Sequence, residues 1–258
     1  MSNRTHLTSS PLGALIGLAS GIPYYWAYTH WNAWGDAVVT AVMLLQFTLM
    51  YIFASKTQRT VLGEWFRGAL VGVNAALNGV FVYMLTESLT LTAILTALVF
   101  ASSFLIISRS RIYHTVLGWF NWFLPMSWAV NLPGLLMFVV NLFFAPIGYI
   151  HPLFRAMRVR LYIDVPSGTF TMYGGLLRPF KGFSGMNMGN FIFINPGWEH
   201  LLRHEIGHLF SVAAMGAPFH YIGGIDEGYF QHNYWEAYAE YFAESYNAPN
   251  RSVMSMWS

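Results

Sequence analysis

The residues best suited to chemistry lie in the stretch EHLLRHEIGHLF, residues 199–210. Within it, residues 204–208 follow the pattern H-E-x-x-H. In a helix, His204 and His208 lie one turn apart on the same face, so both imidazoles can bind one divalent cation from the same side. Glu205 lies about 100° round the helix, close to the cation but not bound to it. This spacing predicts a zinc site in which Glu205 takes a proton from a water that the metal activates.

A third protein ligand is available in NYWEAYAEYFAES, residues 233–245. This stretch has helical character and places Glu236, Glu240 and Glu244 at every fourth position. Two histidines and one carboxylate leave one position of the metal open, which is typical of catalytic zinc sites. Three glutamates in register on an aromatic-rich helix also need a positive charge opposite them. A cation and its histidines would supply that charge.

The arrangement resembles the gluzincin group of metallopeptidases, in a small membrane-integrated form whose helical spans precede a minimal catalytic domain. The resemblance covers residues 155–246 and rests on H-E-x-x-H followed by E-x-x-x-E. It implies Zn²⁺ as the cofactor and Glu236 as the third ligand. It also implies that Glu240 takes the ring N–H of a metal-bound histidine. The group more often has Asp at this later position, so Glu240 is a departure, and its longer side chain can reach a different partner.

Three further residues are weaker candidates. Tyr229 and His232 precede the helix of Glu236, and either could act as a catalytic donor of a hydrogen bond to the developing oxyanion. His200 lies one turn before His204 and could contact substrate or Glu236. A solvated or capping histidine is the simpler interpretation of His200.

The composition indicates where the membrane lies. The chain has 258 residues, of which 55% are hydrophobic and 9% charged, whereas soluble domains carry roughly 25% charged residues. Only nine of the charged residues fall within residues 1–150, and fifteen fall within 151–258. We therefore predict two parts, a helical membrane region at 1–150 and a small metallopeptidase domain at 151–258. The small net charge of +2 and the lack of a Lys/Arg run exclude nucleic acid as a partner.

Apolar windows of about 20 residues predict six membrane spans. The first four are residues 11–30, 36–55, 66–86 and 89–108. Residues 115–150 carry no charge and are too long for one span, and the turn signal NLPG at 131–134 divides them into a hairpin of two short helices, 115–130 and 135–150. A single long tilted helix or a re-entrant hairpin are the alternatives.

Basic and acidic loops alternate along these spans, and the positive-inside rule then places the N-terminus and the catalytic domain in the cytoplasm. The stretch HEIGHLFSVAAMGAPFHYIGGIDE is also similar to one found in multi-span bacterial proteins, in which H-E-x-G-H precedes a Gly-Pro-type turn. This resemblance implies the bacterial inner membrane as the location and the lipid bilayer as a partner.

The pattern changes after residue 150. Residues 158–165 alternate apolar and polar side chains as a half-buried strand does. Residues 169–176 follow the turn residues 166–168 as a second strand, and residues 190–195 form a third short strand. Residues 182–189, rich in Gly and Met, are expected to form a loop, and 198–214 a helix. The predicted fold class is therefore mainly α: a multi-span helical region followed by a small α+β zincin-like domain. That domain has a short mixed sheet, the H-E-x-x-H helix and the helix of the glutamate ligand.

Together these features predict a membrane-integrated zinc metallopeptidase acting on peptides or membrane proteins. The strand at 190–195 would pair with an extended substrate. A site-2-type intramembrane protease is disfavoured, because charged Glu199 and Arg203 flank the motif and no apolar span follows residue 214. A hydrolase of lipids or other amides stays open. So does a non-catalytic membrane scaffold or sensor whose structural zinc is closed by His200 or His232 as fourth ligand.

Overall fold

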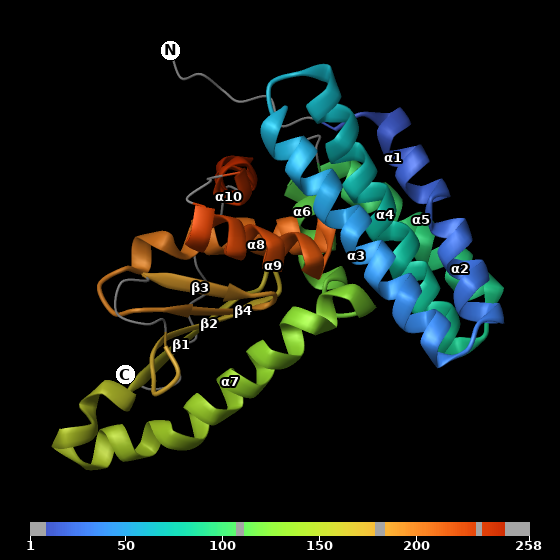
Figure 1. Ribbon diagram of the computed structural model, residues 1–258. Coiled ribbons are helices and arrows are strands. Elements are labelled where there is room, and N and C mark those ends of the chain that lie inside the picture. The colour runs from blue at the N-terminus through green and yellow to red at the C-terminus, as the bar shows by residue number, and fades with distance from the viewer. Residues whose placement is uncertain (1–8, 107–110, 179–183, 231–233, 246–258) are drawn as a thin grey trace. The chain divides into compact units, whose positions relative to one another are not determined.

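The computed structural model describes residues 9–106, 111–178, 184–230 and 234–245 (Figure 1). The chain forms two compact units, one of residues 1–110 with 214–238 and one of residues 111–213 with 239–258. The boundary falls inside two continuous helices, α8 (Leu202–Met215) and α10 (Tyr234–Ser245). These boundaries, which follow from packing, differ from the boundary at residue 150 that the change in composition predicts.

The first unit is built round α4 (Val61–Thr86), which packs against α1 (Pro11–Ala19), α3 (Ala33–Lys56) and α5 (Leu89–Ile106). The backbones of α1 and α4 touch. A Cβ atom added to Gly17 would lie 2.2 Å from the Ala69 carbonyl oxygen, and one added to Gly72 would lie 2.0 Å from that of Ala14. Glycines and alanines at such positions let helices approach closely inside a bilayer.

Within the described parts of the chain, three helices are long and apolar enough to cross a membrane: residues 34–56 within α3, residues 61–86, which are α4, and residues 125–150, which are α7 (Pro125–Ile150). The first predicted span is instead two short helices, α1 and α2 (Gly21–His30), which meet at Ser20. Pro23 explains the break, because its ring clashes with the carbonyl of residue 19 in a continuous helix. Among the described residues, α5 offers a shorter apolar segment, 89–101.

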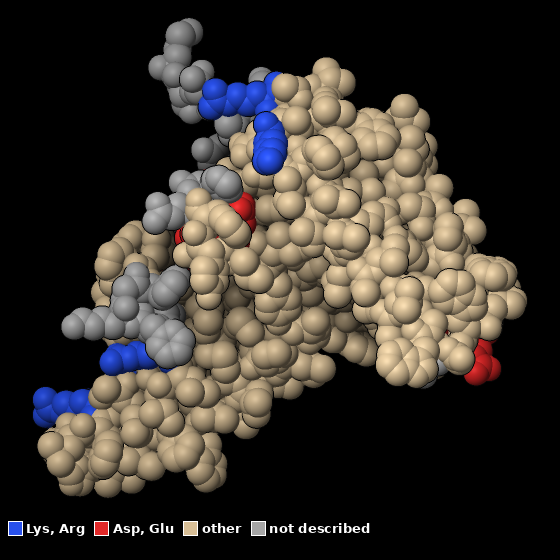
Figure 2. All heavy atoms as spheres, in the orientation of Figure 1, with Lys and Arg blue, Asp and Glu red and all other residues tan. Residues whose placement is uncertain are grey.

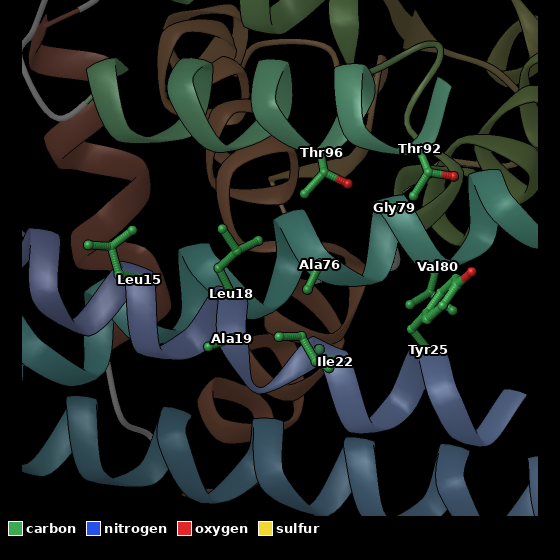
Figure 3. Close-up of a pocket in the computed structure, with 11 residues that line it drawn as sticks. Leu15, Leu18, Ala19, Ile22, Tyr25, Ala76, Gly79, Val80, Thr92 and Thr96 are labelled. Carbon is green, nitrogen blue, oxygen red and sulfur yellow. The ribbon is translucent and has the colours of Figure 1, made fainter. Parts of the chain in front are cut away.

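The helices α1, α2, α4 and α5 surround a pocket of about 420 Å³ (Figure 3). Its lining is mostly aliphatic, with the polar side chains of Tyr25, Thr92 and Thr96. It contains neither histidine nor carboxylate, so this pocket is not the place for the metal chemistry that the sequence predicts.

The second unit contains a four-stranded sheet of β1 (Val159–Asp164), β2 (Thr169–Gly174), β3 (Gly185–Met188) and β4 (Phe191–Ile194), in the order β1-β2-β4-β3. β2 and β4 are parallel and the other pairs antiparallel. The predicted mixed sheet and mainly helical fold class are confirmed. The outer strand β3 corrects the loop expected there. Glycine and asparagine disfavour strands, but the hydrogen bonds to β4 outweigh that preference.

The helix α7 corrects the predicted hairpin. The preceding helix α6 (Arg111–Phe120) ends early, and α7 runs unbroken through residues 131–134. The NLPG residues pack against the sheet instead of turning. Asn131 Oδ1 accepts a hydrogen bond of 2.8 Å from the Asn190 amide, and a Cβ atom on Gly134 would lie 2.7 Å from the Met188 carbonyl oxygen. In the NLPG stretch, Gly134 and Asn131 therefore serve to pack α7 against the sheet and do not form a turn.

The core of this unit lies between α7 and the sheet. The ring centroid of Phe138 on α7 lies 5.3 Å from that of Phe191, and Trp122 lies 5.3 Å from the same ring. Val159, Leu161, Met172 and Phe193 complete the buried cluster. A 3₁₀ turn, η1 (Pro152–Met157), joins α7 to β1, and a second one, η2 (Glu199–Leu201), leads into α8. α8 passes over the sheet on the side away from α7 (Figure 1).

Candidate metal centre

The helix α8 carries both histidines of the H-E-x-x-H pattern on one face. The Nε2 atoms of His204 and His208 lie 3.1 Å apart. For tetrahedral zinc with Zn–N bonds of 2.0–2.1 Å, the spacing of two ligand nitrogens would be about 3.3 Å. The two rings are therefore already placed as a pair of ligands would be. His208 is only 2% exposed, so its nitrogen is held in this position by packing.

The helix α10 runs antiparallel to α8 with a fixed register. The Arg203 Nε donates a hydrogen bond to the Ala243 carbonyl oxygen, and His204 Nδ1 lies 2.7 Å from Glu240 Oε1. One turn further along α8, a Cβ atom on Gly207 would lie 2.1 Å from the Ala239 carbonyl oxygen. Each step forward on α8 thus matches a step backward on α10. The same register places Glu236 opposite His208.

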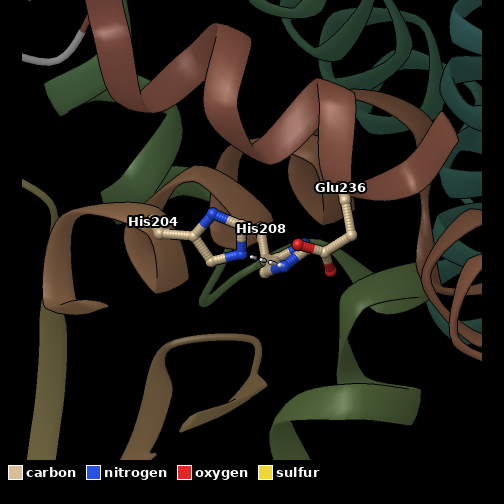
Figure 4. Close-up of side chains that lie close together, drawn as sticks. All are labelled: His204, His208 and Glu236. Atoms are coloured by element: carbon tan, nitrogen blue, oxygen red, sulfur yellow. Dashed lines mark hydrogen bonds between the residues drawn. The ribbon is translucent and has the colours of Figure 1, made fainter. Parts of the chain in front are cut away.

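These two helices bring the predicted ligands together (Figure 4). One ligand atom each of His204, His208 and Glu236 lies within 4.8 Å of the others. Glu236 is half-buried and comes from the first turn of α10. Two imidazoles and one carboxylate are a donor set that binds a divalent cation. The described residues therefore contain a candidate metal centre of three protein ligands, as the sequence predicted.

Glu240 orients the first of these ligands. Its carboxylate lies 2.7 Å from His204 Nδ1. When that ring nitrogen donates its proton to the carboxylate, the Nε2 atom carries a lone pair, which faces the Nε2 of His208. A carboxylate on the outer nitrogen also raises the basicity of a metal-binding histidine. The longer glutamate side chain thus reaches the histidine that an aspartate serves in the resembled group.

Glu205 is held next to the ligands by the sheet. It is 6% exposed, and its carboxylate lies against the backbone of β3, where a Cβ atom on Gly185 would lie 2.2 Å from Oε1. The Asn187 side chain donates a hydrogen bond of 2.9 Å to the Glu205 carbonyl oxygen and another to the Gly189 carbonyl oxygen. The outer strand β3 thereby fixes the first turn of α8. Neither Gly185 nor Asn187 was singled out from the sequence.

The weaker candidates are not part of this group. His200 is exposed on η2, where its ring centroid lies 5.6 Å from that of Trp198. Tyr229 is 83% exposed on a single π-helical turn, residues 226–230. His232 lies outside the described residues. Two residues before the candidate ligand Glu236 in α10 is Tyr234, and burial of its phenol raises the pKa of this side chain.

Gly207, between the two histidines, was not singled out from the sequence. Gly207 is where the two helices touch backbone to backbone. A glycine inside a helix costs about 1 kcal/mol relative to alanine, so its presence between two ligands indicates a close contact. The strand expected to pair with substrate is also corrected: β4 is hydrogen-bonded on both sides, by β2 and β3. The edge next to Glu205 belongs to β3.

Comparisons with known proteins gave no match. None of the protein-family models, curated proteins or solved structures matches this chain. The resemblance to gluzincins therefore rests on the pattern of residues alone, and the function must be argued from the geometry of α8, α10 and β3.

Proposed function

We propose that the chain is a membrane-integrated zinc metallopeptidase, which hydrolyses peptide bonds of membrane or membrane-proximal substrates. The observation that carries the proposal is the convergence of His204, His208 and Glu236, with the buried Glu205 on the same turn as the two histidines. Bound zinc would polarise the scissile carbonyl and lower the pKa of the attacking water. The three ligands leave one coordination position for this chemistry, which separates a catalytic site from a structural one.

Zinc is the metal that best suits the donors. Imidazole nitrogens favour zinc and neighbouring transition metals, whereas Mg²⁺ and Ca²⁺ prefer sites built of oxygen atoms alone. The chain has no cysteine, so a thiolate site is excluded. The His204–Glu240 contact supports this assignment, because metal-binding histidines usually give their second ring nitrogen to a carboxylate or carbonyl.

Glu205 is the proposed general base. It would take the proton from the attacking water and pass it to the leaving amine. Gly185 and Asn187 hold it in place from β3. Glu240 would fix the tautomer and orientation of His204. Tyr229 and His232 stay proposals for donors to the oxyanion, since either would have to reach a substrate that the structure does not contain.

The edge of β3 supports a peptide as the substrate. β3 pairs only with β4 within the sheet, so its outer backbone groups can bind an extended chain. Because the Glu205 carboxylate lies against Gly185, a chain bound along this edge would pass next to the proposed base. The basic loops of the sequence further suggest that the catalytic residues lie on the cytoplasmic side of the membrane.

The substitution Glu205→Gln tests the proposal. It keeps the size of the side chain but removes the base, so we expect turnover to fall 10²- to 10⁴-fold. We expect zinc to stay bound, at one ion per chain by elemental analysis. Turnover is read by comparing the peptide ends of membrane proteins in cells that carry the wild type or the variant. Glu199→Gln, an exposed acid at the start of the same helical segment, is the matched control.

Two outcomes would contradict the proposal. Equal peptide ends in the Glu205→Gln and wild-type cells, with the protein present in both, would mean that no peptide bond depends on Glu205. The purified wild type would contain no zinc if the three residues held no metal. A zinc content that stays the same when His208 is replaced by Ala would mean the same.

A further inference from the structure

The helix α7 meets the length and composition of a membrane span, yet its packing does not fit a crossing helix. One side of α7 is bound to the sheet near its beginning. The Asn131 side chain exchanges hydrogen bonds with Asn190, at 2.8 Å and 3.2 Å. A Cβ atom on Gly134 would lie 2.7 Å from the Met188 carbonyl oxygen, so helix and strand touch there.

The same side of α7 stays bound to the sheet at its far end. The Asn141 side chain makes two hydrogen bonds of 2.7 Å with the backbone of Leu177, directly after β2. The Tyr149 hydroxyl donates a hydrogen bond of 2.7 Å to the Val159 carbonyl oxygen in β1. From Asn131 to Tyr149 the sheet therefore accompanies α7 for about 27 Å, at 1.5 Å per residue.

A length of 27 Å is nearly the hydrocarbon thickness of a bilayer, about 30 Å. If α7 crossed the membrane, the sheet would cross with it. β1 and β3 are the outer strands, and their outer backbone groups find no partner strand among the described residues. Each such group costs several kcal/mol in hydrocarbon. The exposed ion pair of Arg160 and Glu199, at 2.7 Å, would also enter the lipid. A crossing α7 is therefore strongly unfavourable.

The other side of α7 is as apolar as lipid. Its exposed side chains are Leu132, Leu135, Leu136, Val139, Phe143, Ile147 and Ile150. Just beyond the helix, Arg155 and Arg158 are exposed on and after η1. Figure 2 shows basic groups at this end of the molecule, beside a broad surface without charge. Apolar side chains next to basic residues fit the surface of a bilayer with anionic headgroups, to which each basic residue contributes about 1 kcal/mol.

We propose that α7 does not cross the membrane but lies in its surface, with the apolar side in the lipid and the sheet facing water. The exposed arginines would contact anionic headgroups at one end of the helix. The sheet would thereby hold α8 and its histidines at a fixed height above the bilayer. This inference concerns membrane attachment and stands whether or not the site hydrolyses peptides.

The orientation has a consequence for sidedness. A single crossing by α7 would put residues before and after it on opposite sides of the membrane. An in-plane α7 leaves both on one side, as the predicted hairpin would also have done.

The chain has no cysteine, so single cysteines can report sidedness directly. Trp128→Cys lies near the start of α7 and Leu153→Cys just after its end, and both positions are exposed. A membrane-impermeant maleimide should label both from the same side of sealed vesicles. The control pair, Trp34→Cys and Val61→Cys, flanks α3 and should be labelled from opposite sides. Labelling of residues 128 and 153 from opposite sides would overturn the proposal.

The depth of α7 residues in the bilayer tests the orientation independently. It also covers a position that lipid headgroups shield from the maleimide. A fluorophore on Leu136→Cys, Phe143→Cys or Ile150→Cys should be quenched to the same depth by spin-labelled lipids. A crossing helix would instead separate residues 136 and 150 by about 21 Å in depth. Such a gradient would exclude the in-plane orientation. Unchanged zinc content of each variant shows that the fold is kept.

Discussion

At the scale of single residues, the candidate site depends on a contact between a carboxylate and a residue without a side chain. Glu205 lies buried on α8 against Gly185, and Oε1 would be 2.2 Å from a Cβ atom there. The contacting atoms are the end of a flexible side chain, so the carboxylate can move aside at low cost to the fold. A side chain added at residue 185 should therefore affect the position of the proposed base more than it affects the stability of the protein.

The substitution Gly185→Ala follows from this contact. We expect the thermal midpoint to change by only a few degrees and zinc to remain bound, while turnover falls at least tenfold because Glu205 is displaced. Midpoint, zinc content and cleavage of membrane proteins measure the three effects. Gly224→Ala, where an added Cβ atom meets nothing within 4 Å, is the control. Wild-type turnover in Gly185→Ala would show that activity does not depend on the position that Glu205 takes against residue 185.

At the scale of elements, the antiparallel register of α8 and α10 decides which glutamate serves which histidine. The pairs 203 with 243, 204 with 240 and 207 with 239 are in contact, and the next pair in this series is His208 with Glu236. The two helices can keep this register only if they approach closely at Gly207. The distance between the helices, and with it the ligand geometry, is set at that point.

The substitution Gly207→Ala is therefore expected to lose zinc. Alanine favours the helix by about 1 kcal/mol, but the added methyl would meet a rigid carbonyl at 2.1 Å, and such overpacking costs about 1–3 kcal/mol. We expect a net destabilisation of about 1 kcal/mol and zinc affinity reduced at least tenfold, measured by thermal unfolding and competition with a chelator. Ser211→Ala, which removes only a bond to the His208 carbonyl oxygen within α8, should retain zinc. Wild-type zinc affinity in Gly207→Ala would refute the role of the contact.

At the scale of the whole molecule, a cation would join α8 and α10, two helices whose ligands lie about thirty residues apart in the chain. A ligand that binds only the folded chain stabilises it by RT ln(1 + [L]/Kd), about 4 kcal/mol at a thousandfold excess over Kd. The metal should therefore contribute to the stability of the complete protein as well as to its chemistry.

Removal of the metal tests this coupling. In detergent solution, a chelator should lower the thermal midpoint of the wild type by several degrees, and added Zn²⁺ should restore it. His208→Ala should start at the lower midpoint and respond to neither addition, because the buried ligand is missing. A wild-type midpoint that ignores both chelator and zinc would mean that the three residues do not bind a stabilising ion.

The sequence alone indicated the candidate ligands and most elements, because these follow from local spacing. A pattern of period four puts His204 and His208 on one helical face, and apolar alternation together with turn residues predicts three of the four strands. High hydropathy likewise indicated the long apolar helices α3 and α4, whereas residues 125–150 were expected to be divided and form the single helix α7. Each of these inferences needs only residues that are close in the chain.

Features that depend on contacts between residues far apart in the chain were decided only by the tertiary structure. Asn131 and Gly134 suggest a turn by type, but the sheet they pack against makes them part of a continuous helix. Residues 185–188 form a strand only because β4 lies beside them. The same applies to the orientation of α7: its composition permits a crossing, and the sheet bound along it is the physical reason to reject one.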